Sequence, residues 1–140
     1  MMIEYNKPIK NDGSEAFRKC VMDFCLAPKI KTIRITKEDI EQLLIDRELT
    51  VVFEKTNNLQ DMINDLQSSK ESFATCIIKM VYLKINPHCN PKVEEVFPLN
   101  DFIRLFANTE TPLWGFASDE SVAIRMEVMY AYSPKLSKHE

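Results

Sequence analysis

Glycine is scarce in this sequence, and its scarcity limits the kinds of site that the chain can build. Only Gly13 and Gly115 occur among 140 residues, whereas average composition would give about ten glycines in this length. Loops that cradle a phosphate need several closely spaced glycines, because only glycine lets backbone N–H groups crowd around the anion. The sequence therefore excludes a glycine-rich nucleotide-binding loop. No cofactor is predicted, although a ligand site built from side chains remains open.

The length and charge are those of one ordinary globular domain. The chain has 45% hydrophobic residues and a formal net charge of −3, which gives no general attraction to nucleic acid or to anionic lipid. No apolar run reaches the length of a signal peptide or the roughly 20 residues of a membrane-spanning helix. The four cysteines include no Cys-x-x-Cys pair. We therefore predict a cytoplasmic protein with reduced thiols that binds neither nucleic acid nor membrane.

Capping residues and apolar periodicity predict one domain at residues 14–133, between a flexible leader at 1–13 and a polar tail at 134–140. Helices are predicted over residues 14–25, 36–49, 57–69 and 91–108. Ser14 is a suitable cap for the first helix. Thr36 and Asp39 have capping-box spacing at the start of the second. Pro98 begins or interrupts the fourth, because proline is tolerated only in the first turn of a helix.

Apolar runs predict strands over residues 50–55, 72–86, 111–118 and 122–132, and a short strand or extended loop over 29–35. A short polar turn joins the last two strands, so we expect them to pair antiparallel. Strand–helix–strand segments favour parallel or crossover neighbours. The predicted fold is α/β (α+β). It is a two-layer sandwich, in which helices pack on at least one face of a mixed sheet of about four strands.

Residue types that carry chemistry are few. His88 and Cys89 share a loop, but a metal site needs three or four ligands at suitable spacing, so no metal site is predicted. A cysteine nucleophile needs a nearby base, and neighbouring residues usually point apart, so no catalytic residue is predicted either. Trp114 and Phe116 alternate along one strand and should share a face, either as core or as an exposed aromatic anchor for a partner. The basic stretch at 29–34, with Lys37, is either a solvated edge or a surface for an acidic partner or a phosphate that a partner presents.

Several stretches together resemble the C-terminal domain of the bacterial tubulin homologue FtsZ. The matching stretches are IKTIRITKEDIEQLL, CIIKMVYLKIN, VEEVFPLNDFIRLFAN, TPLWGFASDES and VAIRMEVMYAYS. They follow the family's order of elements over most of the chain. The resemblance implies an FtsZ/tubulin C-terminal-domain-like fold that assembles with other proteins.

Two departures from the family pattern restrict what the resemblance implies. The GTPase domain with its glycine-rich phosphate loop is missing from this sequence. The family's Asn-x-Asp-x-x-Asp pattern, whose acids help to position the attacking water in the next subunit's nucleotide site, is replaced at residues 34–39 by Arg-Ile-Thr-Lys-Glu-Asp. Of the acidic positions in the family pattern, only the last retains an acid, Asp39. A capping role in the helix explains Asp39 without a partner. We therefore expect neither GTP binding nor full activation of hydrolysis.

The resulting hypothesis is a non-catalytic interaction domain that acts in cell division as a structural or regulatory (capping) partner of tubulin-like polymers. Its partner would be an FtsZ/tubulin-like GTPase domain or a second copy of itself, contacted through Ile33, Arg34, Thr36, Lys37, Glu38 and Asp39.

Two alternatives remain. One is a small enzyme with a chorismate-mutase-like two-layer fold and an intersubunit site, for which Arg104, Arg125 and Glu127 are the candidates. The other is a domain of this fold with an unrelated partner.

Overall fold

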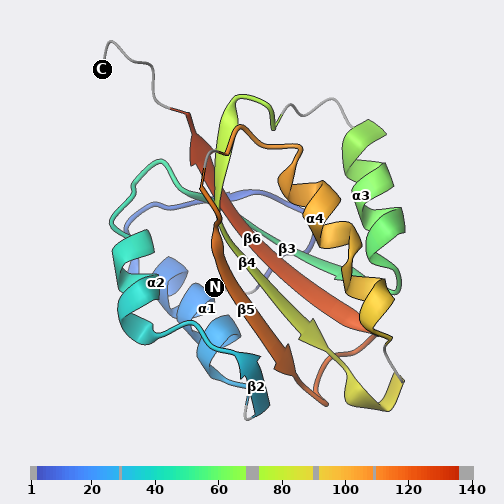
Figure 1. The fold of residues 1–140 in the computed structure, drawn as a ribbon. Coiled ribbons are helices and arrows are strands. Elements are labelled where there is room, and N and C mark those ends of the chain that lie inside the picture. The colour runs from blue at the N-terminus through green and yellow to red at the C-terminus, as the bar shows by residue number, and fades with distance from the viewer. Residues whose placement is uncertain (1–2, 29, 69–72, 90–91, 109, 136–140) are drawn as a thin grey trace.

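A six-stranded mixed sheet forms the centre of the molecule, with strand order β1-β3-β6-β4-β5-β2 (Figure 1). The computed structural model describes residues 3–28, 30–68, 73–89, 92–108 and 110–135. The strands are β1 (Ile9–Lys10), β2 (Ile30–Ile33), β3 (Thr50–Thr56), β4 (Cys76–Ile85), β5 (Leu113–Ser118) and β6 (Met126–Pro134). The helices are α1 (Glu15–Leu26), α2 (Lys37–Leu43), α3 (Leu59–Ser68) and α4 (Pro98–Ile103), with two short 3₁₀ turns, η1 (Pro87–Cys89) and η2 (Val93–Val96).

The helix starts are where the capping residues predicted them. The backbone N–H of Phe17 donates to Ser14 Oγ at 3.1 Å, which starts α1. At the start of α2 the N–H of Asp39 donates to Thr36 Oγ1 at 3.1 Å, and the N–H of Thr36 donates to the Asp39 carboxylate at 3.2 Å. This reciprocal pair satisfies donors that the first turn leaves free. The fourth predicted helix is instead divided into η2 and α4, because Pro98 can only begin a new helix.

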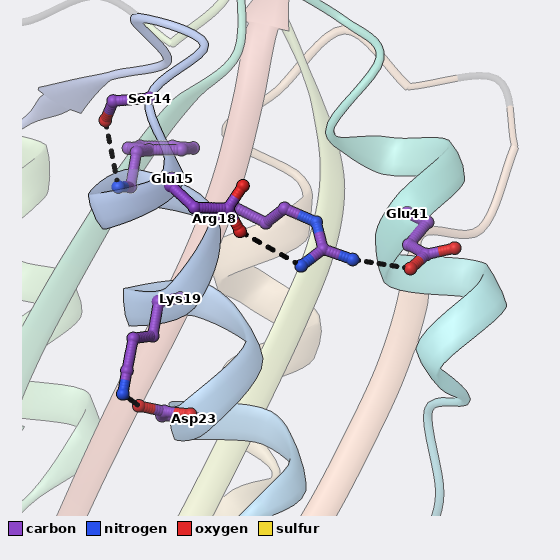
Figure 2. A network of polar contacts seen from close by, with 7 residues as sticks. Ser14, Glu15, Arg18, Lys19, Asp23 and Glu41 are labelled. Carbon is purple, nitrogen blue, oxygen red and sulfur yellow. Dashed lines mark hydrogen bonds and ion pairs between the residues drawn. The ribbon is translucent and has the colours of Figure 1, made fainter.

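Polar contacts also join α1 to α2 (Figure 2). Arg18 on α1 lies between Glu15 on its own helix and Glu41 on α2, with nitrogen–oxygen distances of 3.4 Å and 2.6 Å. Below the two helices, the side chains of Phe17, Val21 and Ile40 are buried against the sheet. The apolar contacts fix α1 and α2 on one face, and Arg18 links their exposed sides.

The pairing of the last two strands differs from the prediction. β5 and β6 are not neighbours, because β4 lies between them, parallel to β5 and antiparallel to β6. The connection at residues 119–125 passes the end of β4, where the Asp119 N–H donates to the Ile85 carbonyl and the Asn86 N–H to the Arg125 carbonyl. β6 is buried on both faces, and the position between β3 and β4 gives it a hydrogen-bonded neighbour on each side.

Helices cover both faces of the sheet, so the α/β sandwich has three layers rather than the predicted two. One apolar core joins α1 and α2 to Phe53, Met80 and Tyr82, and the other joins α3 and α4 to residues such as Val81 and Tyr130. A register shift between Ile78 and Met80 changes which side chains of β4 face each core. The sheet also exceeds the expected four strands, because β1 and β2 extend its two edges.

β1 comes from the segment predicted as a leader, and the tail falls partly outside the described residues. In the described part of that segment, Asn11 is buried and donates to the carbonyls of Leu44 and Asp46, and β1 pairs with β3. Residues 136–140 of the predicted tail lie outside the described residues. None of the helices in the described part has both the length and the apolar character needed to cross a membrane.

Candidate interaction surface

The six predicted interface residues follow one another across the end of β2 and the start of α2. Ile33 is 49% exposed at the end of β2, and Arg34, Lys37 and Glu38 are exposed. Thr36 and Asp39 bond to one another in the capping box. The structure therefore gives Thr36 and Asp39 a local role in starting α2, whereas Ile33, Arg34 and Lys37 present their side chains outward.

Ile33 lies at an apolar hollow between β2, β5 and the start of α4, which we name the β2–α4 groove. Its volume is about 200 Å³, and its apolar lining includes Ile33, Val96, Phe97, Leu99, Trp114 and Phe116. Phe97 is 57% exposed. Trp114 and Phe116 line the groove from the same face of β5 and are half-buried, packed at the edge of the second core. The interpretation of this pair as core is therefore confirmed in part, because each ring adjoins the core. The rings are also open to the groove, and their role as an anchor for a partner stays a prediction.

Gly115 lies between the two aromatic residues and has a packing role. It is the register partner of Tyr82 on β4. A Cβ atom at Gly115 would lie 2.1 Å from Tyr82 Cδ2, far inside van der Waals contact. The absence of a side chain therefore lets the fully buried Tyr82 ring lie across β5.

Three cations lie in β2, the edge strand next to the groove, and in the residues that follow it. Lys31, Arg34 and Lys37 form a group that we name the basic edge, with Lys31 half-buried and the other two exposed. β2 is the last strand in the sheet order, so the edge that faces away from β5 pairs with no other described strand. The ion pairs between described residues involve none of these three cations. Their charge is therefore available to a partner.

A second polar group, which the sequence interpretation missed, lies buried beneath α1. Lys84 on β4 is 7% exposed, with its Nζ 3.9 Å from Asp119 Oδ2 and 3.7 Å from the centre of the Phe24 ring. Burial lowers the pKa of Lys84, while Asp119 and then Glu127 oppose that shift. Glu127 pairs with Lys84 in register and accepts a hydrogen bond from the Tyr5 hydroxyl at 3.1 Å.

Burial also raises the pKa of the Cys25 thiol to about 12. The available sequence signal for the buried polar group around Lys84 was a lysine inside an apolar strand. The contacts of Lys84 are those of a paired structural ion rather than of an open site.

The residues of the enzyme alternative have separate partners. Arg125 binds Glu95 through distances of 2.5 Å and 2.6 Å, whereas Glu127 binds Tyr5. Arg104 is exposed and lies 3.6 Å from Asp101. These contacts do not join Arg104, Arg125 and Glu127 into one site.

His88 and Cys89 lie in the short turn η1 after β4. His88 lies 3.2 Å from Glu120, with both side chains largely exposed. Within the described ranges, no three His, Cys, Asp or Glu side chains come together in a way that would hold a metal ion.

Comparisons of the chain with protein-family models, with curated proteins and with solved structures found no match.

Proposed function

We propose that this chain is a non-catalytic protein–protein interaction domain that docks its partner on the β2–α4 groove and the basic edge. The observation that carries the proposal is the exposure of Phe97 and Ile33, at 57% and 49%, beside Trp114 and Phe116. Exposed apolar side chains that gather around a hollow with a charged rim are typical of interaction sites, and aromatic residues often provide the binding energy there.

The proposed surface keeps part of the interface predicted from the sequence. Ile33 supplies apolar contact, and Arg34 and Lys37 supply charge. Glu38 lies beside them, and Thr36 and Asp39 hold the start of α2. The groove adds Phe97 and Trp114, which come from other parts of the chain.

The resemblance to the FtsZ C-terminal domain makes a tubulin-like polymer the first partner to test. A domain that binds the end of such a polymer and does not accept a further subunit would stop its growth, which is the capping role. The resemblance supports this partner through the order of the matching stretches, and the groove supports docking as such.

The experiment compares a groove variant with a control variant that removes exposed apolar surface elsewhere. Ile33→Ser/Phe97→Ser removes apolar side chains from the groove. Ile45→Ser is the control, because Ile45 is 68% exposed and lies after α2, outside the groove. Assembly of FtsZ with GTP is followed by light scattering in the presence of sub-stoichiometric protein. We expect the wild type and the Ile45→Ser variant to reduce the scattering, and the groove variant to leave it unchanged.

Two results would count against parts of the proposal. Unchanged scattering with the wild type removes FtsZ as the partner but leaves docking through the groove open. The second measurement is co-purification from native lysate with identification by mass spectrometry. Proteins retained equally by the wild type, the control and the groove variant would show that the groove is not the docking surface.

A further inference from the structure

The outer strand of the sheet, β2, exposes apolar side chains. β2 is four residues long, and Ile30 and Ile33 are 67% and 49% exposed. Proteins usually shield an edge strand, since its unpaired backbone groups can bind another strand. The outer edge of β2 pairs with no other described strand. An extended segment of another chain can therefore add to it.

The two faces of β2 differ in chemistry. Ile33 lines the groove, on the face toward α4. Lys31 lies toward α1, where its charge opposes the burial that raises the pKa of the Cys25 thiol. Regular alternation would place residues 31 and 33 on the same face of the strand, but a register shift between them pairs Lys31 with Ala117 and Ile33 with Phe116, so these two side chains face opposite sides of the sheet. A strand added beside β2 would therefore meet apolar surface on one face and positive charge on the other.

The charge of this region argues against a second copy as the occupant. Residues 31–37 read KTIRITK, with three cations and no acid. Two β2 strands paired with each other would bring these cations together, and like charges on paired strands are destabilising. An acidic strand meets the same cations favourably and is attracted to them before contact.

The size of the groove indicates a side chain as its occupant. Its volume of about 200 Å³ is below the roughly 300–1,000 Å³ of small-molecule sites. One large apolar side chain that enters between Phe97 and Trp114 would bury both rings further, as anchor residues do at interfaces.

We infer, resting on the proposed function, that the partner presents an extended segment in which apolar and acidic side chains alternate, and that this segment adds as a strand to the free edge of β2. Its apolar side chains cover Ile33 and fill the β2–α4 groove. Its acidic side chains face Lys31, Arg34 and Lys37.

The test selects binders from a random-peptide display library on the purified full chain. The charge-reversed variant Lys31→Glu/Arg34→Glu is screened in parallel. The control is Lys10→Glu, which reverses an exposed lysine that lies on β1, at the opposite edge of the sheet, and pairs with Glu48. We expect the wild type and the control to enrich peptides in which acidic and apolar residues alternate. The affinity of an enriched peptide, measured by fluorescence anisotropy, should fall about tenfold or more in the charge-reversed variant, and in the wild type as salt is raised.

Strand addition is measured separately by hydrogen exchange. An enriched peptide should slow exchange of the β2 backbone amides in the wild type. Enrichment of basic or uncharged peptides, equal enrichment on the charge-reversed variant, or no enrichment at all would each overturn the inference. A concentration-dependent increase in mass on sedimentation, abolished by Ile33→Ser/Phe97→Ser, would overturn it in favour of a second copy.

The outcomes also separate the inference from the proposed function. Peptides of the wrong charge that still require Ile33 and Phe97 would overturn the inference and leave the proposed function standing. Peptides that bind Ile33→Ser/Phe97→Ser as well as they bind the wild type would overturn both, because they would dock elsewhere.

Discussion

Gly115→Ala tests whether the close contact between β4 and β5 depends on the missing side chain. The new Cβ would lie 2.1 Å from Tyr82 Cδ2, and ordinary contact begins at 3.4 Å, so the ring or the strand must move by about 1.3 Å. Tyr82 is 0% exposed, and Phe24 packs edge-on against it with ring centres 5.9 Å apart. The ring therefore has no open space into which it can move.

The expected loss of stability combines two opposing effects. Overpacking of a filled core typically costs about 1–3 kcal/mol. Replacing glycine by alanine also restricts the unfolded chain, which returns about 0.4–1 kcal/mol. We expect a net decrease of about 1–2 kcal/mol in the free energy of unfolding, or about 3–8 °C in Tm for a domain of this size.

Urea unfolding, followed by circular dichroism and by the fluorescence of the single tryptophan, measures this change. The control places Gly115→Ala in a Tyr82→Leu background, in which the obstructing ring is gone. There the alanine should cost at least about 1 kcal/mol less than in the wild type, because substitutions of contacting residues are not additive. Two results would refute the packing argument: an equal cost of Gly115→Ala in both backgrounds, or no loss of stability when Gly115→Ala is made in the wild type.

Three further predictions concern other buried or capping groups. Tyr82→Phe should raise the free energy of unfolding by about 1 kcal/mol, because the buried Tyr82 hydroxyl has no hydrogen-bond partner among the described residues; a loss of stability would show that the hydroxyl is bonded. Thr36→Ala should lower the free energy of unfolding by about 1 kcal/mol through loss of the α2 cap. Thr36→Ser should keep most of the wild-type value, because serine can also cap the helix. The pKa of Cys25 is raised in the folded state from 9.0 to about 12. The contribution of the protonated thiol to the free energy of unfolding is therefore complete below pH 9 and is lost as pH rises toward 12. Urea midpoints should therefore fall less steeply over that range in Cys25→Ala, and equal slopes would contradict this.

Local features of the sequence determined where α1 and α2 begin and which segments form β3, β4, β5 and β6, but not β1. Ser14 and the Thr36–Asp39 pair cap helices through residues three positions apart, so no distant contact is needed to predict them. The basic stretch and the alternation of Trp114 with Phe116 were likewise readable. The shared face of Trp114 and Phe116 depends only on the period of a strand, whereas the face of Lys31 relative to Ile33 depends on the register shift in β2.

Tertiary structure alone decided the strand order, the layers and the candidate site. Strand order depends on which apolar surfaces are buried together, and β6 gains two neighbours by lying between β3 and β4 rather than beside β5. Lys84 meets Asp119 only because β4 and β5 run parallel to the same end of the sheet. Phe97 reaches Trp114 and Ile33 across the groove from a segment distant in sequence. Such contacts depend on the positions of whole elements, which a local pattern does not encode.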